Sequence, residues 1–235
     1  MGTEFTDRSV VVTGGTGALG GAVLARLLDE GAVCHVPTSH ASAPKDFNFA
    51  KHDRVKLAFS VDLGDAASVD AFYASVPGLW ASIHCAGAFA MSPIGDSAAD
   101  VFAEMIEANA KATFLCCHAA ARAMLGPGTA GRIVNVTARP GLDPRKGSGM
   151  SAYAASKAAV AAITVALAEE LKGNGIFVNA VAPSTLDTPA NRAAMPKADF
   201  AKWVSLDTAA EAIVHLASPE NTAISGALVP IYGRT

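Results

Sequence analysis

Tyr153 and Lys157 are the two residues of this chain whose types and spacing most directly suggest chemistry. They lie four positions apart in an alanine-rich stretch that predicts a helix, so both side chains should project from one face. An ammonium group beside a phenol favours the phenolate and lowers the pKa of the tyrosine. The pair therefore predicts a tyrosine that gives or takes a proton near neutral pH.

A glycine-rich turn near the N-terminus predicts a dinucleotide site. Gly14, Gly17 and Gly20 follow the β-branched residues 10–12 at three-residue spacing, and an amphipathic helix pattern comes next. Such a strand, turn and helix N-terminus place backbone N–H groups and the positive end of the helix dipole against a pyrophosphate. A glycine turn without function would have the same composition, but the flanking strand and helix favour the dinucleotide site.

The composition fits one α/β domain and argues against several other classes. With 235 residues, 51% hydrophobic content and 21 glycines, the chain can bury a parallel sheet. A net charge of −3 without a basic cluster argues against nucleic acid as a partner. None of the four cysteines has metal-ligand spacing, so we expect reduced thiols, no metal and a cytoplasmic protein.

Strand and helix patterns alternate along the chain, which predicts an α/β fold of the doubly wound, Rossmann type. The predicted strands cover residues 9–13, 32–36, 55–61, 80–85, 132–137, 176–181 and 227–231. The predicted helices cover residues 18–30, 66–75, 98–108, 110–125, 153–172 and 208–217. Right-handed crossovers then give a seven-stranded parallel sheet with helices on both faces, in a single domain over residues 9–235. Residues 1–8 are expected to be disordered or vector-derived.

Several polar or distinctive residues fall at the predicted carboxyl ends of strands, where ligands bind in such sheets. Thr13, Cys85, Thr137 and Pro183 end four strands, and Tyr153 follows the loop after the fifth strand. We therefore expect the chemistry to converge on one edge of the sheet.

The glycine turn and the tyrosine–lysine pair together resemble the short-chain dehydrogenase/reductase family, and the resemblance covers nearly the whole chain. Asn109 matches the family's active-site asparagine, and Cys85-Ala86-Gly87 is similar to the Asn-Ala-Gly segment that lies beside the cofactor. The resemblance implies cofactor contacts from Gly14, Thr16, Gly17, Ala18, Leu19, Gly20, Thr38, Ser39, Asp62, Leu63, Cys85, Ala86, Gly87, Lys157, Pro183, Leu186 and Thr188.

The resemblance also implies a role for each catalytic residue. Tyr153 would supply a proton or a hydrogen bond, and Lys157 would hold the nicotinamide ribose and depress the tyrosine pKa. Asn109 would anchor a water that links Lys157 to solvent. Family members tend to pair long helices, so we expect a homodimer or homotetramer that acts on a small molecule and binds neither nucleic acid nor membrane.

Ala138 departs from the family pattern, because the family carries a substrate-binding serine at this position. A hydroxyl of Thr137 or Ser148 could replace that serine, although Thr137 should point to the other face of its strand; alternatively, Ala138 could mark a non-catalytic relative. Quinonoid dihydropteridine reductases also lack the serine, and residues 185–203 here resemble theirs. That resemblance implies a substrate lid around residues 184–205. It also implies substrate contacts from Ala138, Arg139, Met150, Asn191 and Trp203.

The end of the second strand bears on the choice of cofactor. Thr38 and Ser39 stand where dihydropteridine reductases carry an aspartate. Without that carboxylate a 2′-phosphate is not repelled, so we expect NADP(H) to be slightly favoured over NAD(H). We predict an NAD(P)H-dependent oxidoreductase, similar to dihydropteridine reductase, that transfers hydride to a conjugated C=N or C=O of a small planar molecule. The alternatives are a general carbonyl or 3-oxoacyl reductase and a non-catalytic NAD(P)-binding sensor or subunit.

Overall fold

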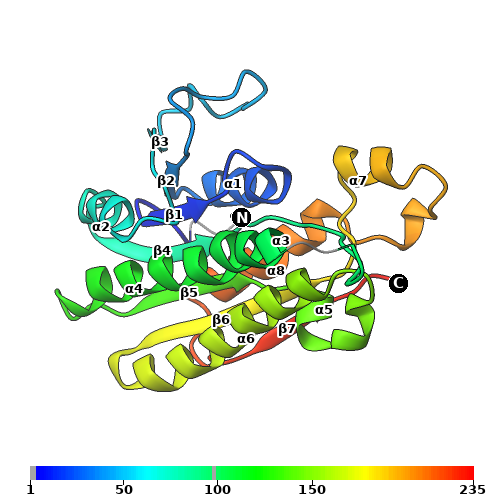
Figure 1. The fold of residues 1–235 in the computed structure, drawn as a ribbon. Coiled ribbons are helices and arrows are strands. Elements are labelled where there is room, and N and C mark those ends of the chain that lie inside the picture. The colour runs from blue at the N-terminus through cyan, green and yellow to red at the C-terminus, as the bar shows by residue number, and fades with distance from the viewer. Residues whose placement is uncertain (1–3, 97–98) are drawn as a thin grey trace.

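The computed structural model describes residues 4–96 and 99–235, and its centre is a seven-stranded parallel sheet (Figure 1). The strands are β1 (Ser9–Thr13), β2 (Val33–Pro37), β3 (Val55–Ala58), β4 (Leu79–His84), β5 (Gly131–Val136), β6 (Ile176–Pro183) and β7 (Leu228–Ile231). The spatial order β3-β2-β1-β4-β5-β6-β7 changes direction at β1, and every neighbouring pair is parallel. The predicted doubly wound sheet is confirmed, and its switch point lies between β1 and β4.

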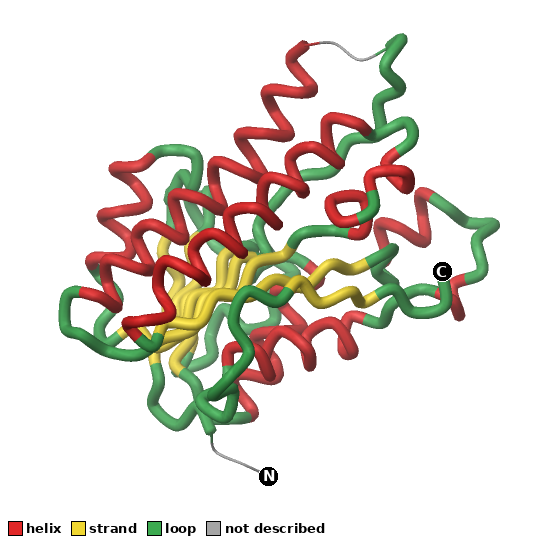
Figure 2. Tube along the Cα trace, turned by 90° about the horizontal axis from the view of Figure 1, so that it is seen from below, coloured by secondary structure: helices red, strands yellow, loops and turns green. Residues whose placement is uncertain are grey.

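Two layers of helices enclose the strands (Figure 2). Helices α1 (Ala18–Asp29) and α8 (Leu206–Ala217) pack together on one face of the sheet. Helices α2 (Ala66–Ala74), α4 (Ala112–Leu125) and α6 (Ser151–Leu171) cover the other face. The shorter helical segments are α3 (Ala99–Met105), η1 (Ile106–Lys111), α5 (Arg139–Leu142), η2 (Pro144–Gly147), η3 (Lys172–Asn174), α7 (Pro189–Ala194) and η4 (Phe200–Lys202).

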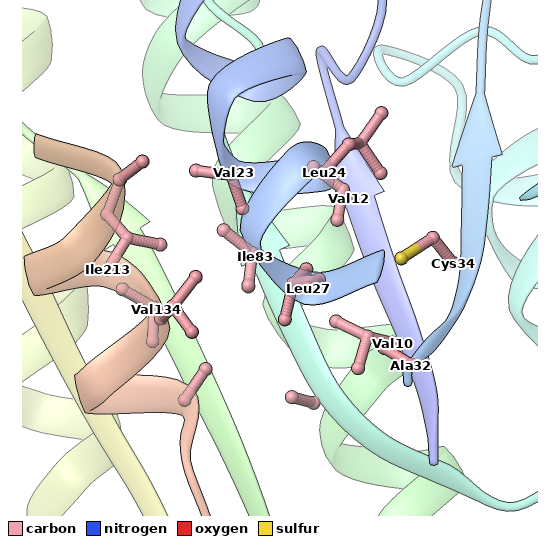
Figure 3. Packing of buried hydrophobic residues seen from close by; sticks show 14 of the residues in the cluster. Val10, Val12, Val23, Leu24, Leu27, Ala32, Cys34, Ile83, Val134 and Ile213 are labelled. Atoms are coloured by element: carbon pink, nitrogen blue, oxygen red, sulfur yellow. The ribbon is translucent and has the colours of Figure 1, made fainter. Parts of the chain in front are cut away.

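Alternation along β1 shows how the valine-rich strands hold this sandwich together. Val10 and Val12 enter the apolar cluster shared with α1 and α8, whereas Val11 enters the cluster of α2, α4 and α6. Figure 3 shows Val10 and Val12 in the first cluster with Leu24 and Leu27 of α1, all four fully buried. Burial of both faces of β1 and of one face of α1 fixes the glycine turn that joins them.

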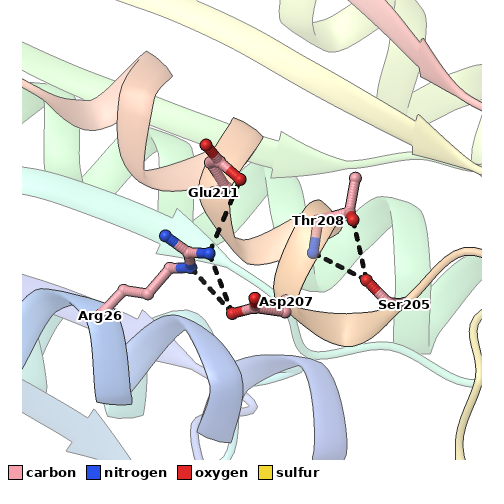
Figure 4. Close-up of polar contacts among 5 residues, drawn as sticks. All are labelled: Arg26, Ser205, Asp207, Thr208 and Glu211. Carbon is pink, nitrogen blue, oxygen red and sulfur yellow. Dashed lines mark hydrogen bonds and ion pairs between the residues drawn. The ribbon is translucent and has the colours of Figure 1, made fainter.

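An exposed ion pair adds a polar contact between α1 and α8 (Figure 4). Arg26 Nη2 lies 2.9 Å from Asp207 Oδ1 and 3.6 Å from Glu211 Oε2. Ser205 caps α8, because its Oγ accepts a hydrogen bond from the Thr208 N–H at 3.0 Å. Both carboxylates are largely exposed, so the ion pair contributes less than about 1 kcal/mol. Apolar packing is therefore what holds α8 to the sheet.

Residues 4–8 differ from the disordered N-terminus that the sequence suggested. Phe5 is fully buried in the cluster that contains the apolar face of α1. The Asp7 N–H donates a hydrogen bond to the Gly31 carbonyl at 3.1 Å. A buried phenylalanine removes a large apolar area from water, so this short segment belongs to the domain. Residues 1–3 lie outside the described residues.

Strand β3 is shorter than predicted, and the difference shapes the edge of the site. It ends at Ala58 instead of residue 61, because Ser60 adopts a left-handed backbone with φ of 57°. The chain then turns back, and the Val61 N–H donates to the Thr38 carbonyl at 2.9 Å. This turn brings the segment after β3 beside the end of β2.

The helices predicted at residues 98–108 and 110–125 form one continuous rod. Residue 98 lies outside the described residues, and from Ala99 the chain runs through α3, the π-helical turn η1 and α4 without a break. Asn109 lies inside η1. A π-turn shifts side chains around the helix axis and is common where a functional residue must be re-aimed.

Helix α6 and its extension, Ser151–Asn174, form the one described helix long and apolar enough to cross a membrane. It packs against α5, β6 and η1, and it carries the buried Lys157. These contacts identify it as a core helix of the domain.

Candidate active site

The glycine turn after β1 lies directly against the segment that follows β4. Gly14 has φ of +67°, and a Cβ at this position would lie 2.6 Å from the Ala86 nitrogen. The Ala86 N–H donates to Thr13 Oγ1 at 3.3 Å, and the Cys85 N–H donates to the Thr13 carbonyl at 3.1 Å. A Cβ on Gly20 would lie 2.2 Å from the Gly14 carbonyl oxygen. Only glycine fits these positions, and the contact brings two predicted cofactor segments together.

The N-terminus of α1 is open at this turn. Gly17 is the N-cap residue and supplies no side-chain cap, while Ala18 and Leu19 form the start of the first helical turn. Gly17 and Ala18 are exposed. The first N–H groups of a helix have no partner within it, so they are free to bind an anion such as a pyrophosphate.

A cavity of about 620 Å³ adjoins the turn at the carboxyl ends of the strands. Its lining includes residues predicted to contact the cofactor: Gly14, Thr16, Thr38, Ser39, Asp62, Leu63 and Ala86. Its far wall comes from α3, η1 and α4, and includes Glu104, Glu107 and Lys111, which the sequence analysis missed. Lys111 Nζ lies 2.7 Å from Glu107 Oε2, and the (i, i+4) spacing of this pair was the signal that could have drawn attention to it.

The end of β2 presents hydroxyl and imidazole groups to the cavity and no carboxylate. Thr38 is buried, and its Oγ1 accepts a hydrogen bond from the His40 N–H at 3.3 Å. Ser39 and His40 are exposed and line the same space. Asp62 is turned towards its own loop, where Oδ1 accepts from the Gly64 N–H at 2.8 Å. Asp62 therefore lies in the loop after β3 and does not supply the carboxylate that is missing at the end of β2.

Asn109 is fully buried and fastens the segment after β4 to α6. Its Oδ1 accepts from the Ala88 N–H and its Nδ2 donates to the Ala88 carbonyl, both at 3.0 Å. Nδ2 also donates to Ser156 Oγ at 3.1 Å, and that hydroxyl donates to the Tyr153 carbonyl at 2.8 Å. A Cβ on Gly87 would lie 2.5 Å from Asn109 Oδ1, so a larger residue here would displace the Asn109 side chain from these hydrogen bonds.

Lys157 is buried beside the same glycine. Its Nζ lies 3.2 Å from the position a Gly87 Cβ would occupy and donates to the Val136 carbonyl at 2.9 Å. Burial lowers the pKa of Lys157 to about 8, and the neighbouring Cys85 thiol opposes that shift. Asn109 and Lys157 thus approach the backbone of Gly87 together, as the sequence analysis required of a single site.

The prediction that Lys157 lowers the pKa of Tyr153 is wrong for this structure. The Lys157 Nζ lies 6.0 Å from the centre of the Tyr153 ring and is engaged by the Val136 carbonyl. Burial instead raises the pKa of Tyr153 to about 12. A spacing of four residues places both side chains on one helix face, but desolvation dominates the ionisation of the phenol.

Phe89 contacts Tyr153, although the sequence analysis did not include it in the candidate site. Its ring packs edge-to-face against Tyr153, with centroids 5.0 Å apart and an interplanar angle of 79°, and the residue is 61% exposed. It follows Gly87 by two residues, and that position beside the predicted cofactor segment was the available signal.

Neither Thr137 nor Ser148 is placed to replace the missing serine hydroxyl at position 138. The Thr137 hydroxyl donates to the Lys157 carbonyl at 2.6 Å, so its hydrogen is not available to a substrate. Ser148 lines a different cavity, of about 470 Å³, with Ala155 and Ala158 on the side of α6 opposite Tyr153. Ala138 itself is buried and is the N-cap residue of α5.

Residues 8–199 match the family model of the short chain dehydrogenases. The chain belongs to this family. It is 30% identical over 228 residues to an uncharacterized oxidoreductase of Staphylococcus aureus (strain USA300). The matched region covers 95% of this chain and 96% of the relative. It is also 30% identical over 209 residues to the short chain dehydrogenase/reductase notP' of Aspergillus versicolor, covering 83% of this chain and 72% of the relative.

Solved structures show the same fold. A short chain dehydrogenase/reductase family protein superposes with a TM-score of 0.88 at 27% identity, covering 98% of this chain and 97% of the other. The protein ElxO with NADP bound superposes with a TM-score of 0.87 at 21% identity, covering 97% and 98%. This short-chain dehydrogenase is therefore an NAD(P)-dependent oxidoreductase. Its fold does not specify a substrate, because one fold hosts many reactions.

The lid predicted at residues 184–205 of this short-chain dehydrogenase is a folded unit held by its own hydrogen bonds. Thr188 caps α7, with Oγ1 accepting from the Asn191 N–H at 3.1 Å. The Asn191 amide donates to the Leu186 carbonyl at 2.8 Å, and Leu186 pairs with Val204 in an isolated bridge. Thr188 and Asn191, predicted to contact cofactor and substrate, thus both bond within the lid.

Side chains of the lid pack on one another beyond Pro183, the buried last residue of β6. Trp203, a predicted substrate residue, lies with its ring centroid 4.8 Å from that of Phe200. The Arg192 guanidinium packs over the Phe200 ring, with Cζ 4.8 Å from the ring centroid. Arg192 Nε also lies 2.6 Å from Asp187 Oδ1. These contacts give the segment a defined shape before any ligand binds.

Arg139, predicted to contact the substrate, is bonded to the chain beyond β7 in this structure. Its Nη1 donates to the Thr235 carbonyl at 2.8 Å, and its Cζ lies 4.7 Å from the centre of the Tyr232 ring. The guanidinium therefore holds the chain beyond β7, because a planar cation stacks on an aromatic face while donating at its edge. Met150, also predicted to meet the substrate, is half-buried at the N-cap of α6, three residues before Tyr153.

Proposed function

We propose that this protein is an NADPH-dependent reductase that delivers a hydride to a conjugated C=O or C=N group of a planar small molecule. The observation that carries the proposal is the convergence on Gly87. Lys157 Nζ and Asn109 Oδ1 both approach it, and the neighbouring Ala86 contacts Gly14 of the open glycine turn. The helix that bears Tyr153 is thereby tied to the dinucleotide turn.

The residues present fit an NADP(H) cofactor. The uncapped start of α1 and the close-packed glycines suit a pyrophosphate, and the adjoining cavity of about 620 Å³ can receive an adenosine half. Thr38, Ser39 and His40 would bind the 2′-phosphate through hydrogen bonds. The NADP bound in ElxO supports this preference by analogy of fold.

Tyr153, Lys157 and Asn109 would each have a separate role in the proposed reaction. When bound, the nicotinamide supplies the hydride. Tyr153 would donate its phenolic proton to the oxygen or nitrogen of the substrate, since its raised pKa keeps it protonated at neutral pH. Lys157 would hold the nicotinamide ribose from its place beside Gly87, and Asn109 would anchor the water that links Lys157 to solvent.

Ala138 narrows the class of substrate. A simple ketone develops negative charge on oxygen during reduction and needs a second hydrogen-bond donor, which Thr137 does not provide. An electron-poor conjugated acceptor spreads that charge over its ring, so one donor suffices. Quinonoid dihydropterin, suggested by the sequence, is one example of such an acceptor among quinones and cyclic imines.

A panel of acceptors tests the proposal. Oxidation of NADPH and NADH would be followed with quinonoid dihydropterin, quinones, cyclic imines and 3-oxoacyl thioesters. We expect turnover of conjugated ring acceptors with NADPH at least as good as NADH. Efficient reduction of 3-oxoacyl thioesters alone would make the protein a general carbonyl reductase. Tight NADPH binding without oxidation by any acceptor would make it a cofactor-binding sensor.

A further inference from the structure

Phe89 presents most of its ring to solvent immediately beside the proposed proton donor. Its ring contacts Tyr153 edge-to-face at 5.0 Å between centroids, yet the residue remains 61% exposed. We propose that Phe89 is a specificity-determining residue whose free face stacks a planar conjugated ring of the substrate beside Tyr153. The inference rests on the proposed function and specifies its substrate class further.

The two rings are held in place by one buried asparagine. Asn109 makes a pair of hydrogen bonds to the backbone of Ala88, the residue before Phe89. The same Asn109 donates to Ser156 Oγ, which donates to the Tyr153 carbonyl. One side chain thus anchors the backbone at Ala88 and, through Ser156, at Tyr153. The aromatic corner, by which we mean the Phe89 and Tyr153 rings, is therefore formed before a substrate arrives. A preformed surface binds without the entropic cost of ordering it.

The connection that carries Phe89 exposes further apolar side chains. Met91 and Ile94 follow it on the same connection between β4 and α3, and both are exposed hydrophobic residues. A ring stacked on Phe89 would bury the remaining face of a large side chain, and aromatic pairs gain stability beyond the area they bury. An aliphatic acceptor of the same reactivity gains only the area term. The corner therefore selects for planarity of the substrate.

Equilibrium binding tests the inference without turnover. The probe is phenanthrol, a fluorescent planar ring that the enzyme cannot reduce, titrated into the complex with NADP⁺. Phe89→Ala should weaken binding about 3- to 10-fold, the range expected for loss of an aromatic pair, and Phe89→Tyr should retain it. Phe114→Ala is the matched control, because Phe114 lies on α4 and is 51% exposed. Equal affinity of Phe89→Ala and wild type, or no binding by wild type, would overturn the inference.

Turnover separates this inference from the proposed function. Phenanthrenequinone and diacetyl carry the same vicinal dicarbonyl on a planar and on an aliphatic frame. Phe89→Ala should raise the ratio of the phenanthrenequinone KM to the diacetyl KM by about the same factor as the binding loss. An equal change for both acceptors would overturn the inference and leave the proposed function intact. Phenanthrol binding that depends on Phe89, without reduction of either acceptor, would support the stacking surface and overturn the proposed function.

Size-exclusion chromatography tests the alternative that the exposed Phe89 ring belongs to an interface between two copies of the chain. If Phe89→Ala dissociates an oligomer while phenanthrol affinity is unchanged, the exposed ring is an interface with a second copy and the inference is wrong. An unchanged elution volume together with weaker phenanthrol binding supports it.

Discussion

The ammonium nitrogen of Lys157 lies 6.0 Å from the centre of the Tyr153 ring and donates its hydrogen bond to the carbonyl oxygen of Val136 at 2.9 Å. The phenol and the ammonium are therefore not a contact ion pair in the free protein. Burial shifts the two pKa values in opposite directions, because it disfavours the charged form of each group. It raises the pKa of Tyr153 to about 12 and lowers that of Lys157 to about 8. As pH rises, Lys157 loses its proton first.

This order predicts the alkaline side of the pH profile. Lys157 is fully charged well below about 8, and its charge is lost as pH rises through about 8, while Tyr153 stays protonated. A neutral amine binds the cofactor ribose more weakly, so kcat/KM for NADPH should fall above about pH 8. The measurement is kcat/KM for NADPH from about pH 6 to about pH 9.5. A flat profile over this range would show that Lys157 keeps its proton.

Thr38→Asp should shift the cofactor preference towards NADH. Thr38 lines the cavity, and an aspartate there could keep the hydrogen bond from the His40 N–H while placing a negative charge against the 2′-phosphate. We expect the NADPH Kd to rise at least about tenfold relative to the NADH Kd. Thr38→Asn is the matched control, because it has the same shape without the charge. Wild type that already binds NADH far more tightly would contradict the role given to the end of β2.

Ala138→Ser should improve the reduction of simple ketones more than that of conjugated ring acceptors. A serine at this N-cap could accept from the backbone of α5 and still donate its hydroxyl hydrogen to a substrate oxygen. The gain for ketones should be up to about 10²–10³-fold in kcat/KM, with little change for quinones. The test compares both acceptor types in Ala138→Ser and in Ala138→Gly, which adds no hydroxyl. Efficient ketone reduction by wild type, unchanged by the serine, would mean that another donor fills the position.

Local sequence signals predicted the fold well, because they act over short distances. The strand, glycine turn and helix at residues 9–29 follow from β-branched residues, close-packed glycines and helical periodicity, and the structure places them as expected. The expectation that Thr137 does not replace the missing serine agrees with the hydrogen bond that its hydroxyl donates to the Lys157 carbonyl. The NAD(P)-dependent class is confirmed by the family to which the chain belongs.

Features set by contacts between distant segments were not predictable from the pattern. Asn109 joins residues 21 positions away through a π-turn that periodicity does not reveal. The pKa of Tyr153 depends on burial, which the spacing to Lys157 does not encode. Arg139 matched a family position, but its guanidinium meets the chain beyond β7. Each of these features depends on how segments distant in sequence pack together.

The most direct test of the central claim is Tyr153→Phe, measured for both turnover and cofactor binding. The phenol is the proposed proton donor and the phenylalanine ring keeps its contact with Phe89, so only proton transfer should suffer. We predict that kcat for the best conjugated acceptor falls about 10²–10⁴-fold while the Kd for NADPH stays within about twofold of wild type. Lys157→Met, by contrast, should lower kcat and also raise the Kd for NADPH. A Tyr153→Phe enzyme with near wild-type kcat on every acceptor would contradict the account.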